Sequence, residues 1–360
     1  VSNKWSYDQR LHTDGDPIEL SAIHSYYNNV ADRGAEAVAT EDDNDPPDED
    51  GPDGMGLTID LVASRISGFD QGQVPSNAMA LTAGIDLGKY ACHWVVVAWF
   101  KGAGGCIVDY GIVDVHGTET AHSHEASEPM IFRALLGWRE QMQSNPFCDS
   151  TGQPRDIDCV LVDSGAFTQA AYEFVRQVGG PFKAGKGIGN YRAKTKSTEK
   201  LRAGDNMHAQ FLDDDKVWLF EMSSDYWKKW VHERFLTPTF TENNTLQKGA
   251  LSLYNPLKRN THLTFGNHIC AEEWVTEFKE GKGTDSRWLV KNRNNHFLDA
   301  LSYASAAGRY CGVHLLNDAV SQAIKLQPTP YQKPERKQFT DRLKQRRGGW
   351  VQGAKKRRVR

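Results

Sequence analysis

The sequence predicts an α/β fold in which helices flank a mixed β-sheet. The first observation is a set of three apolar, strand-like runs between residues 80 and 115, joined by short connections that are typical of an antiparallel meander. The second observation is the alternation of helix-like and strand-like segments from there to residue 312, which is typical of α/β sheets.

The meander consists of three predicted strands. The first ends with "LTAGID" at Asp86, the second is "HWVVVAWF" (93–100), and the third is "CIVDYGIVDV" (106–115). β-Branched and aromatic residues favour strands, and a glycine-rich stretch between the last two runs supplies a turn. A short helix is expected before the meander, within residues 55–80.

The alternating half is predicted from apolar periodicity and from cap residues. In chain order the predictions are a helix at 128–142, a buried strand at 158–163, a helix at 168–180, an extended "PFKA" stretch at 181–184, a strand at 216–222, a helix capped by Ser223 or Ser224, and helices at 267–281 and 294–312. An antiparallel meander followed by helices alternating with strands is the order of a ribonuclease H-like fold.

Charge is unevenly distributed along the chain. Residues 333–360 carry 12 basic and 2 acidic residues (+10), which leaves −13 for the remainder of a chain with a formal net charge of −3. Residues 41–54 hold eight acids and three prolines, too polar to order themselves. We therefore expect an N-terminal linker region at 1–79, a ribonuclease H-like domain at 80–312 and a basic, disordered tail at 313–360.

Composition also limits the cellular setting. No apolar run reaches the length of a membrane-spanning helix, and no signal peptide is visible. The six cysteines lack CxxC spacing, which favours a reducing compartment over a disulfide framework. Because the sequence begins with Val1, we expect it to be a piece of a longer protein.

Three aspartates indicate a site. Asp86 and Asp163 each close an apolar strand-like run, and Asp299 lies in an apolar helix, although Asp is depleted in such places. Three converging carboxylates would bind Mg²⁺ or Mn²⁺, and two such ions would support phosphodiester hydrolysis. Each aspartate also has an ordinary structural explanation, as a turn residue, a helix cap and a partner of a helix dipole, respectively.

The sequence blocks around these aspartates resemble a known family. "GIDLGKYACHWVVVAWFKG", "VLVDSGAFTQAAYEFVRQ" and "KNRNNHFLDALSYASAA" are similar to the nuclease domain of phage terminase large subunits, in their lambda-type branch, over roughly residues 25–310. The resemblance implies that Asp86, Asp163 and Asp299 are the catalytic acids.

The resemblance also implies a function. It implies a metal-dependent endonuclease that cuts concatemeric viral DNA during packaging, in the cytoplasm of the bacterial host. The implied partners are double-stranded DNA, a packaging ATPase domain or subunit, the small terminase subunit and the portal or procapsid, with no membrane.

Several basic residues are candidates for contact with the DNA backbone. A glycine-rich basic segment at 183–196 reads as a loop beside the site, and two further cations precede the last helix. The alternative is an ordinary solvated loop. The candidates are Lys183, Lys186, Arg192, Lys194, Lys196, Lys291 and Arg293.

Other acids and histidines are weaker candidates. Strand alternation places Asp109 and Asp114 on opposite faces, so at most one of them is expected to support the site as a fourth acid or outer partner. His296 could shuttle a proton or simply begin the last helix. "HGTETAHSHE" (116–125) offers His116, His122, His124 and Glu125 to zinc, but a polar hairpin tip is the favoured interpretation.

Two other functions remain open from the sequence. "GIDLG" (84–88) and "VDSGA" (162–166) resemble phosphate loops of actin- and sugar-kinase-like ATPases, although no glycine-rich adenosine loop follows. "GPFKAGKG" (180–187) has P-loop spacing but ends in Gly187, where Ser or Thr is required. The basic tail would also suit a non-catalytic module that docks on DNA or on a procapsid.

Overall fold

The computed structural model describes residues 56–189, 206–239, 248–258, 260–279 and 283–313. The strands are β1 (Ile66–Asp70), β2 (Gln73–Val74), β3 (Ala80–Leu87), β4 (Ala91–Trp99), β5 (Gly105–Asp114), β6 (Phe147–Asp149), β7 (Pro154–Arg155), β8 (Cys159–Asp163), β9 (Phe182–Ile188), β10 (Met207–Leu212), β11 (Val217–Ser223), β12 (Leu251–Asn255), β13 (Glu272–Lys279) and β14 (Gly283–Val290). The helices are α3 (Ile59–Ser64), α4 (His124–Ser144), α5 (Thr168–Val178), α6 (Ser224–Leu236), α7 (Leu263–Ile269) and α8 (His296–Tyr310), with a 3₁₀ turn at Thr118–Thr120.

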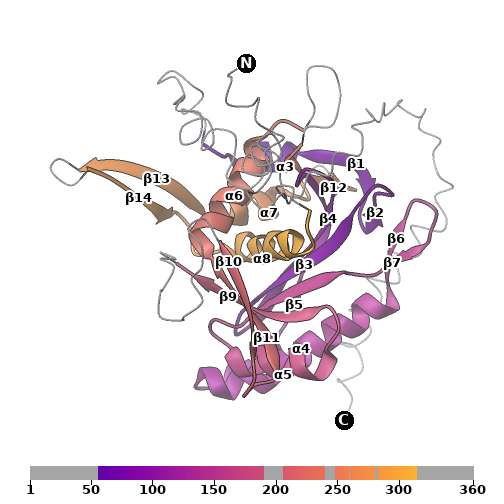
Figure 1. Ribbon diagram of the computed structural model, residues 1–360, viewed down its shortest axis with the longest axis vertical. Coiled ribbons are helices and arrows are strands. Elements are labelled where there is room, and N and C mark those ends of the chain that lie inside the picture. The colour runs from indigo at the N-terminus through magenta and orange to yellow at the C-terminus, as the bar shows by residue number, and fades with distance from the viewer. Residues whose placement is uncertain (1–55, 190–205, 240–247, 259, 280–282, 314–360) are drawn as a thin grey trace, which may run out of the picture. The chain divides into compact units, whose positions relative to one another are not determined.

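A nine-stranded mixed sheet forms the centre of the described chain. Its order is β1-β12-β5-β4-β3-β8-β9-β11-β10. Strands β3, β4 and β5 form an antiparallel meander, and β8 and β9 then extend the sheet in parallel from β3. This order confirms the predicted ribonuclease H-like arrangement, in which helices flank a mixed sheet (Figure 1).

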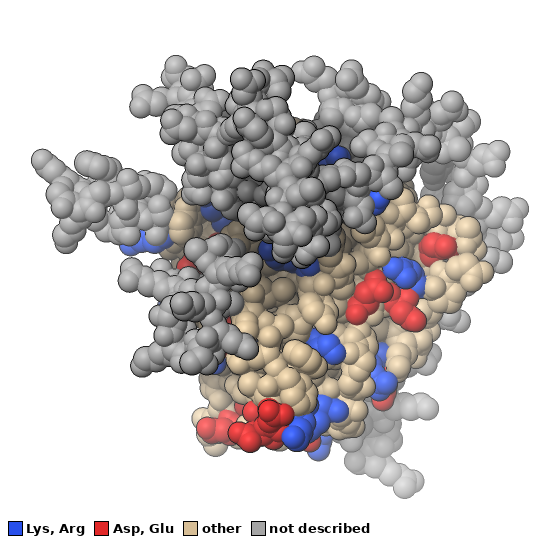
Figure 2. All heavy atoms as spheres, viewed as in Figure 1, with Lys and Arg blue, Asp and Glu red and all other residues tan. Residues whose placement is uncertain are grey.

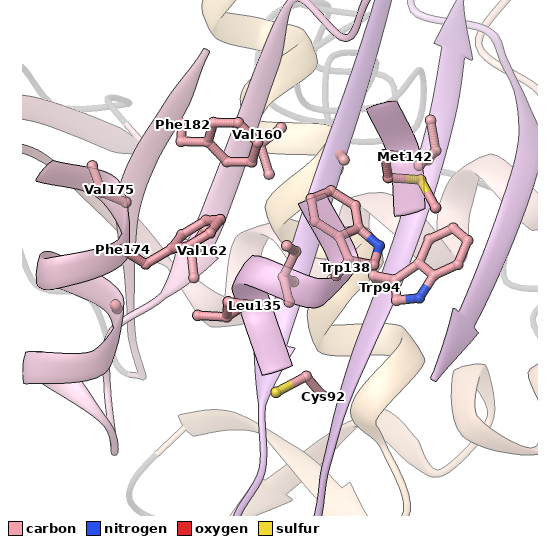
Figure 3. Packing of buried hydrophobic residues seen from close by; sticks show 14 of the residues in the cluster. Cys92, Trp94, Leu135, Trp138, Met142, Val160, Val162, Phe174, Val175 and Phe182 are labelled. Atoms are coloured by element: carbon pink, nitrogen blue, oxygen red, sulfur yellow. The ribbon is translucent and has the colours of Figure 1, made fainter. Parts of the chain in front are cut away.

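The two faces of the sheet are covered by different helices. Along β3, Leu81, Ala83 and Ile85 belong to the apolar cluster that α4 and α5 cover. Figure 3 shows part of this cluster, with Leu135 and Trp138 of α4 and Phe174 of α5. The intervening side chains face α8, as the two-residue period of a strand requires. Helices α6, α7 and α8 share a second apolar cluster with the neighbouring strands on that face.

Helix α8 packs unusually close to β3. A Cβ atom on Gly84 would overlap the carbonyl oxygen of Ala300, so only glycine admits the helix at this point. The hydroxyl of Thr82 donates to the carbonyl of Ala304 at 2.7 Å and accepts from Trp99 Nε1 at 2.7 Å. Small residues on both partners therefore bring the first turn of α8 against the end of β3.

Most predicted helices of the central region are confirmed. Ser223 caps α6 as expected, accepting a hydrogen bond from the Tyr226 amide at 3.2 Å. Helix α4 begins at His124, four residues before the predicted start, because Ser123 accepts from the amide of Ala126 and caps it there. No helix in the described part of the chain is long and apolar enough to cross a bilayer.

The predicted helix at 267–281 is wrong. Residues 267–269 end α7, and Glu272–Lys279 form β13, which pairs antiparallel with β14 over eight residue pairs. Figure 1 shows this two-stranded ribbon extending away from the central sheet. The apolar side chains Trp274 and Trp288 face each other across the two strands at 5.5 Å between ring centroids, so pairing between the strands overrides the helical pattern.

Two other segments differ from the predictions. Residues 66–70 form β1, an edge strand that pairs with β12, so the sheet includes residues before the expected start at 80. The segment 116–123 joins β5 to α4 through a 3₁₀ turn and is not a hairpin tip.

Candidate metal centre at the carboxyl ends of the central strands

Two of the predicted acids lie side by side at the end of the sheet. Asp86 is near the end of β3 and Asp163 ends β8, and these strands are parallel with Ile85 registered against Val162. The next position on each strand is the aspartate, and parallel strands lie about 4.8 Å apart. Alternation along both strands directs Asp86 and Asp163 to the face covered by α8.

The third acid reaches this point from α8. Asp299 lies in the first turn of that helix, as predicted, and burial together with the negative charge of Asp86 raises the pKa of both Asp163 and Asp299. Such coupling acts only over short distances between partly buried carboxylates. The fold thus brings together three acids from three separate parts of the chain.

Hydrogen bonds orient the Asp163 carboxylate. Its Oδ1 accepts from the Tyr303 hydroxyl at 2.5 Å and from the Gly165 amide at 3.0 Å. The same hydroxyl accepts from the Gly187 amide at 2.9 Å, which ties α8 to β9. Burial, followed by the charge of Asp86, raises the pKa of Asp163 to about 6.

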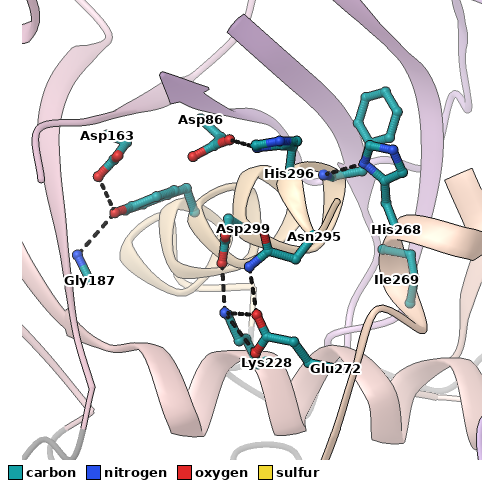
Figure 4. A network of polar contacts seen from close by, with 12 residues as sticks. Asp86, Asp163, Gly187, Lys228, His268, Ile269, Glu272, Asn295, His296 and Asp299 are labelled. Atoms are coloured by element: carbon teal, nitrogen blue, oxygen red, sulfur yellow. Dashed lines mark hydrogen bonds and ion pairs between the residues drawn. The ribbon is translucent and has the colours of Figure 1, made fainter. Parts of the chain in front are cut away.

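A buried lysine pairs with the Asp299 carboxylate. Lys228 on α6 lies 2.9 Å from Asp299 Oδ1 and 2.8 Å from Glu272 Oε1 (Figure 4). Asn295 Nδ2 also donates to Glu272 Oε1, at 2.5 Å. Burial raises the pKa of Asp299, whereas Lys228 opposes that rise.

Asn295 precedes α8 and occupies its N-cap position, but its side chain makes no capping hydrogen bond. Its side-chain Nδ2 instead donates to Glu272, at the base of the β13–β14 ribbon. Asn295 therefore links the start of α8 to the ribbon.

Asp86 is paired with a histidine cluster. His296 Nδ1 lies 2.8 Å from Asp86 Oδ2, and this bond is the main cause that raises the pKa of His296. His93, directly across from Asp86 on β4, stacks on His296 with 4.4 Å between ring centroids. Burial, with the nearby imidazoles, lowers the pKa of His93 to about 3 and that of His268 to about 4.

These residues fit a divalent cation. One ligand atom from each of Asp86, His93 and His296 lies within 4.8 Å of the others, the only such group found among the described residues. The buried Nδ1 of His93 has no hydrogen-bond partner in that part of the chain. The carboxylates repel one another, and a nitrogen without a partner lies beside them. A bound cation would stabilise this arrangement.

The weaker acidic candidates lie outside the row of acids formed by Asp86, Asp163 and Asp299. Asp109 pairs with Val96, whose side chain belongs to the cluster on the other face, and its Oδ1 accepts from Gln71 Nε2 at 2.8 Å. Asp114 is exposed at the end of β5, opposite Ala91. The two acids face opposite sides of the sheet, as alternation predicted.

The first residues of the predicted basic loop are not in a loop, because β9 extends to Ile188. Lys183 and Lys186 therefore lie in a strand, and Lys183 Nζ donates to the Gly180 carbonyl at 2.8 Å. Arg192, Lys194 and Lys196 lie outside the described residues. Figure 2 shows acidic and basic side chains in small mixed groups on the visible described surface.

The two cations before α8 are exposed. Lys291 forms an ion pair with Glu273 at 2.6 Å, and Arg293 lies two residues further toward the helix that carries Asp299. Of the described basic candidates, these two are nearest in the chain to an acid of the site.

The remaining motifs find no support in the geometry. His116, His122 and His124 are exposed and do not form a group of metal ligands in the described chain; His124 stacks on Phe167. The "GPFKAGKG" string largely forms β9 rather than a phosphate-binding loop. The basic tail and the acidic segment lie outside the described residues.

Five residues of the site were missed from the sequence: His93, Lys228, His268, Glu272 and Tyr303. Only His93 left a signal, since it is a polar residue in an apolar strand, two positions after the turn that follows Asp86. The others depend on contacts between α6, α7, α8 and β13, which local patterns do not encode.

A comparison with protein families decides the relationship. The model of the family described as terminase large subunit gpA, endonuclease domain, matches residues 51–320. The chain belongs to this family. No curated protein and no solved structure shows a match. Membership confirms the resemblance to the lambda-type terminase nuclease, and it supports a DNA-cutting role of this gpA endonuclease domain in packaging.

Proposed function

We propose that the protein is a metal-dependent DNA endonuclease that cuts concatemeric viral DNA in the host cytoplasm. Asp86, Asp163 and Asp299 would be its catalytic acids and the ligands of two Mg²⁺ or Mn²⁺ ions. The observation that carries the proposal is the convergence of these acids at one end of the sheet, where the parallel strands β3 and β8 end beside the first turn of α8 (Figure 4).

The protein's own residues hold and orient the acids. Tyr303 and Gly165 both bond to Oδ1 of Asp163, which restrains the carboxylate, and its Oδ2 would bind a cation. Lys228 holds Asp299 through Oδ1 in the same way. When bound, divalent ions would activate an attacking water and stabilise the leaving 3′ oxygen of a phosphodiester.

The DNA backbone would be held by basic residues around this end of the sheet. Lys291 and Arg293 support this role best, because they are exposed and directly precede α8. Lys183 and Lys186 on β9, together with Arg192, Lys194 and Lys196, complete the proposed set. Phosphate contacts of this kind position DNA without reading its sequence.

The expected partners follow from the family. We propose double-stranded DNA as substrate, with a packaging ATPase domain or subunit, the small terminase subunit and the portal or procapsid as assembly partners. The basic residues at 333–360 offset part of the −13 net charge on the rest of the chain.

The test is cleavage of plasmid DNA with Mg²⁺ or Mn²⁺ by the variants Asp86→Asn and Asp163→Asn. Both should lose cutting while retaining their circular dichroism spectrum and cooperative unfolding. Asp114→Asn is the matched control, an exposed acid on the same face outside the row, and should cut normally. Undiminished cutting by either site variant would overturn the proposal.

A further inference from the structure

The row of site residues continues from the acids onto β4. His93 is registered directly against Asp86 in the β3–β4 ladder, so both side chains face α8 from adjacent strands. His296 approaches the same point from the start of α8 and lies 2.8 Å from Asp86. One carboxylate and two imidazoles therefore meet where three elements converge, with ligand atoms within 4.8 Å of one another.

The imidazole of His93 carries an unexplained nitrogen. The residue is only 7% exposed, and its buried Nδ1 has no hydrogen-bond partner in the described chain. Leaving a buried polar atom without a partner is unfavourable, and native structures keep few such atoms.

Aromatic packing accounts for the ring but not for the nitrogen. His93 stacks on His296 and meets Phe297 edge to face, with 5.0 Å between ring centroids. A phenyl ring at position 93 would satisfy both contacts without an unpaired polar atom. The choice of histidine here therefore requires a partner for its nitrogen.

The third imidazole of the cluster has a different role. His268 Nδ1 faces the Phe297 amide at 3.4 Å, so that amide donates to an unprotonated nitrogen. His268 packs at 5.5 Å from His93 and 5.9 Å from His296 between ring centroids. This backbone bond at the start of α8 occupies Nδ1 and makes His268 a packing neighbour of the pair.

We propose that Asp86, His93 and His296 form a mixed nitrogen–oxygen site that binds a first-row transition-metal dication in preference to Mg²⁺. Mg²⁺ favours oxygen ligands and retains its water, whereas imidazole favours later divalent metals. The inference rests on the proposed function for the place of Asp86 in the nuclease centre. Beyond that function, His93 and His296 would be ligands of the ion at Asp86, and this ion would be a transition metal.

The test measures binding of Mn²⁺ and Mg²⁺ to the full chain without DNA. Mn²⁺ binding is followed by electron paramagnetic resonance titration and Mg²⁺ binding by calorimetry. We expect the wild type to bind Mn²⁺ more tightly, and His93→Phe, which keeps the ring, to weaken Mn²⁺ binding at least about tenfold. Mg²⁺ affinity should change less than roughly threefold, because this ion depends on oxygen ligands.

His208→Phe is the control. It also replaces an imidazole with a phenyl ring, but His208 lies on β10 at the edge of the sheet, away from β3 and β4, so Mn²⁺ affinity should be retained. Pulsed electron paramagnetic resonance provides a second measurement, since Mn²⁺ bound by imidazole shows coupling to nitrogen. This coupling should be present in the wild type and in His208→Phe and should be reduced in His93→Phe.

Each outcome separates the two proposals. Equal affinity for Mn²⁺ and Mg²⁺ in the wild type, or unchanged Mn²⁺ binding and nitrogen coupling in His93→Phe, would overturn the mixed site while leaving cleavage dependent on Asp86. Conversely, intact nitrogen coupling in a protein whose cutting does not need Asp86 or Asp163 would support the mixed site and reject the assignment of these aspartates as catalytic acids.

Discussion

Replacing Lys228 with methionine tests how the fold tolerates the acids of the site. The ammonium of Lys228 lies between Asp299 and Glu272, at 2.9 and 2.8 Å, and the three side chains are 12%, 26% and 7% exposed. Methionine preserves much of the apolar stem but removes the charge. Asp299 and Glu272 are then left close together and partly buried without this cation.

The expected loss of stability is large. Removing one partner of a buried ion pair costs about 3–5 kcal/mol, and the partial exposure of Asp299 places the loss near the lower end, about 3 kcal/mol. For a folded unit of this size, each kcal/mol lowers Tm by about 2–4 °C. Lys228→Met should therefore lower Tm by roughly 6–12 °C near pH 8.

The loss should depend on pH with a definite sign. The neighbouring carboxylates raise the pKa of Lys228, so its contribution is complete below the unfolded pKa and is lost only as pH rises through the higher folded pKa. Lys228 also lowers the pKa of Asp299, so the variant raises that pKa further. Protonation of Asp299 then relieves the repulsion, and the loss should be smaller at pH 5 than at pH 8.

The assay is urea unfolding of both proteins at pH 5 and pH 8. Lys229→Met is the matched control, because Lys229 is 50% exposed and its ion pair with Glu233 is long, at 3.9 Å. Exposed pairs of this kind contribute about 0–0.5 kcal/mol. If Lys228→Met is as stable as this control at pH 8, or its loss is independent of pH, the reasoning is refuted.

Two further predictions concern α8. Gly84→Ala should destabilise the fold by about 3 kcal/mol or more, because its Cβ would overlap the Ala300 carbonyl. The control Gly137→Ala has open space around it on α4 and should stabilise the fold by about 0.5–1 kcal/mol. Equal midpoints of urea unfolding for the two variants would contradict this prediction. The hydrogen bond from the Tyr303 hydroxyl lowers the pKa of Asp163, so Tyr303→Phe should raise this pKa above about 6. The folded protein would then take up a proton at higher pH. An unchanged pKa of Asp163 in a carbon-detected NMR titration would disprove this prediction.

The sequence predicted the frame of the fold because local patterns carry it. Alternating apolar residues define β3, β4 and β5, and the spacing of Ile131, Leu135, Trp138 and Met142 defines the buried stripe of α4. Strand β13 was mistaken for a helix because it is stabilised by pairing with β14, a segment outside the local pattern. Cross-strand contacts decide such cases.

The site was predicted in its acids but not in its surroundings. Asp86 and Asp163 are visible because each breaks the apolar pattern at a strand end. Lys228, by contrast, is one of several charges on a polar helix, and only the packing of α6 against α8 brings it to Asp299. Partners that depend on such packing carry no local signature.

The close approach of α8 to β3 has a consequence for when the protein becomes active. His296 and Asp86 are separated by 210 positions in the chain, and they meet only after the glycine at position 84 has admitted the helix. Contacts between such distant segments form slowly. A nascent or truncated polypeptide that lacks this helix still carries two of the acids but not the third, so the proposed DNA cleavage would require the complete fold.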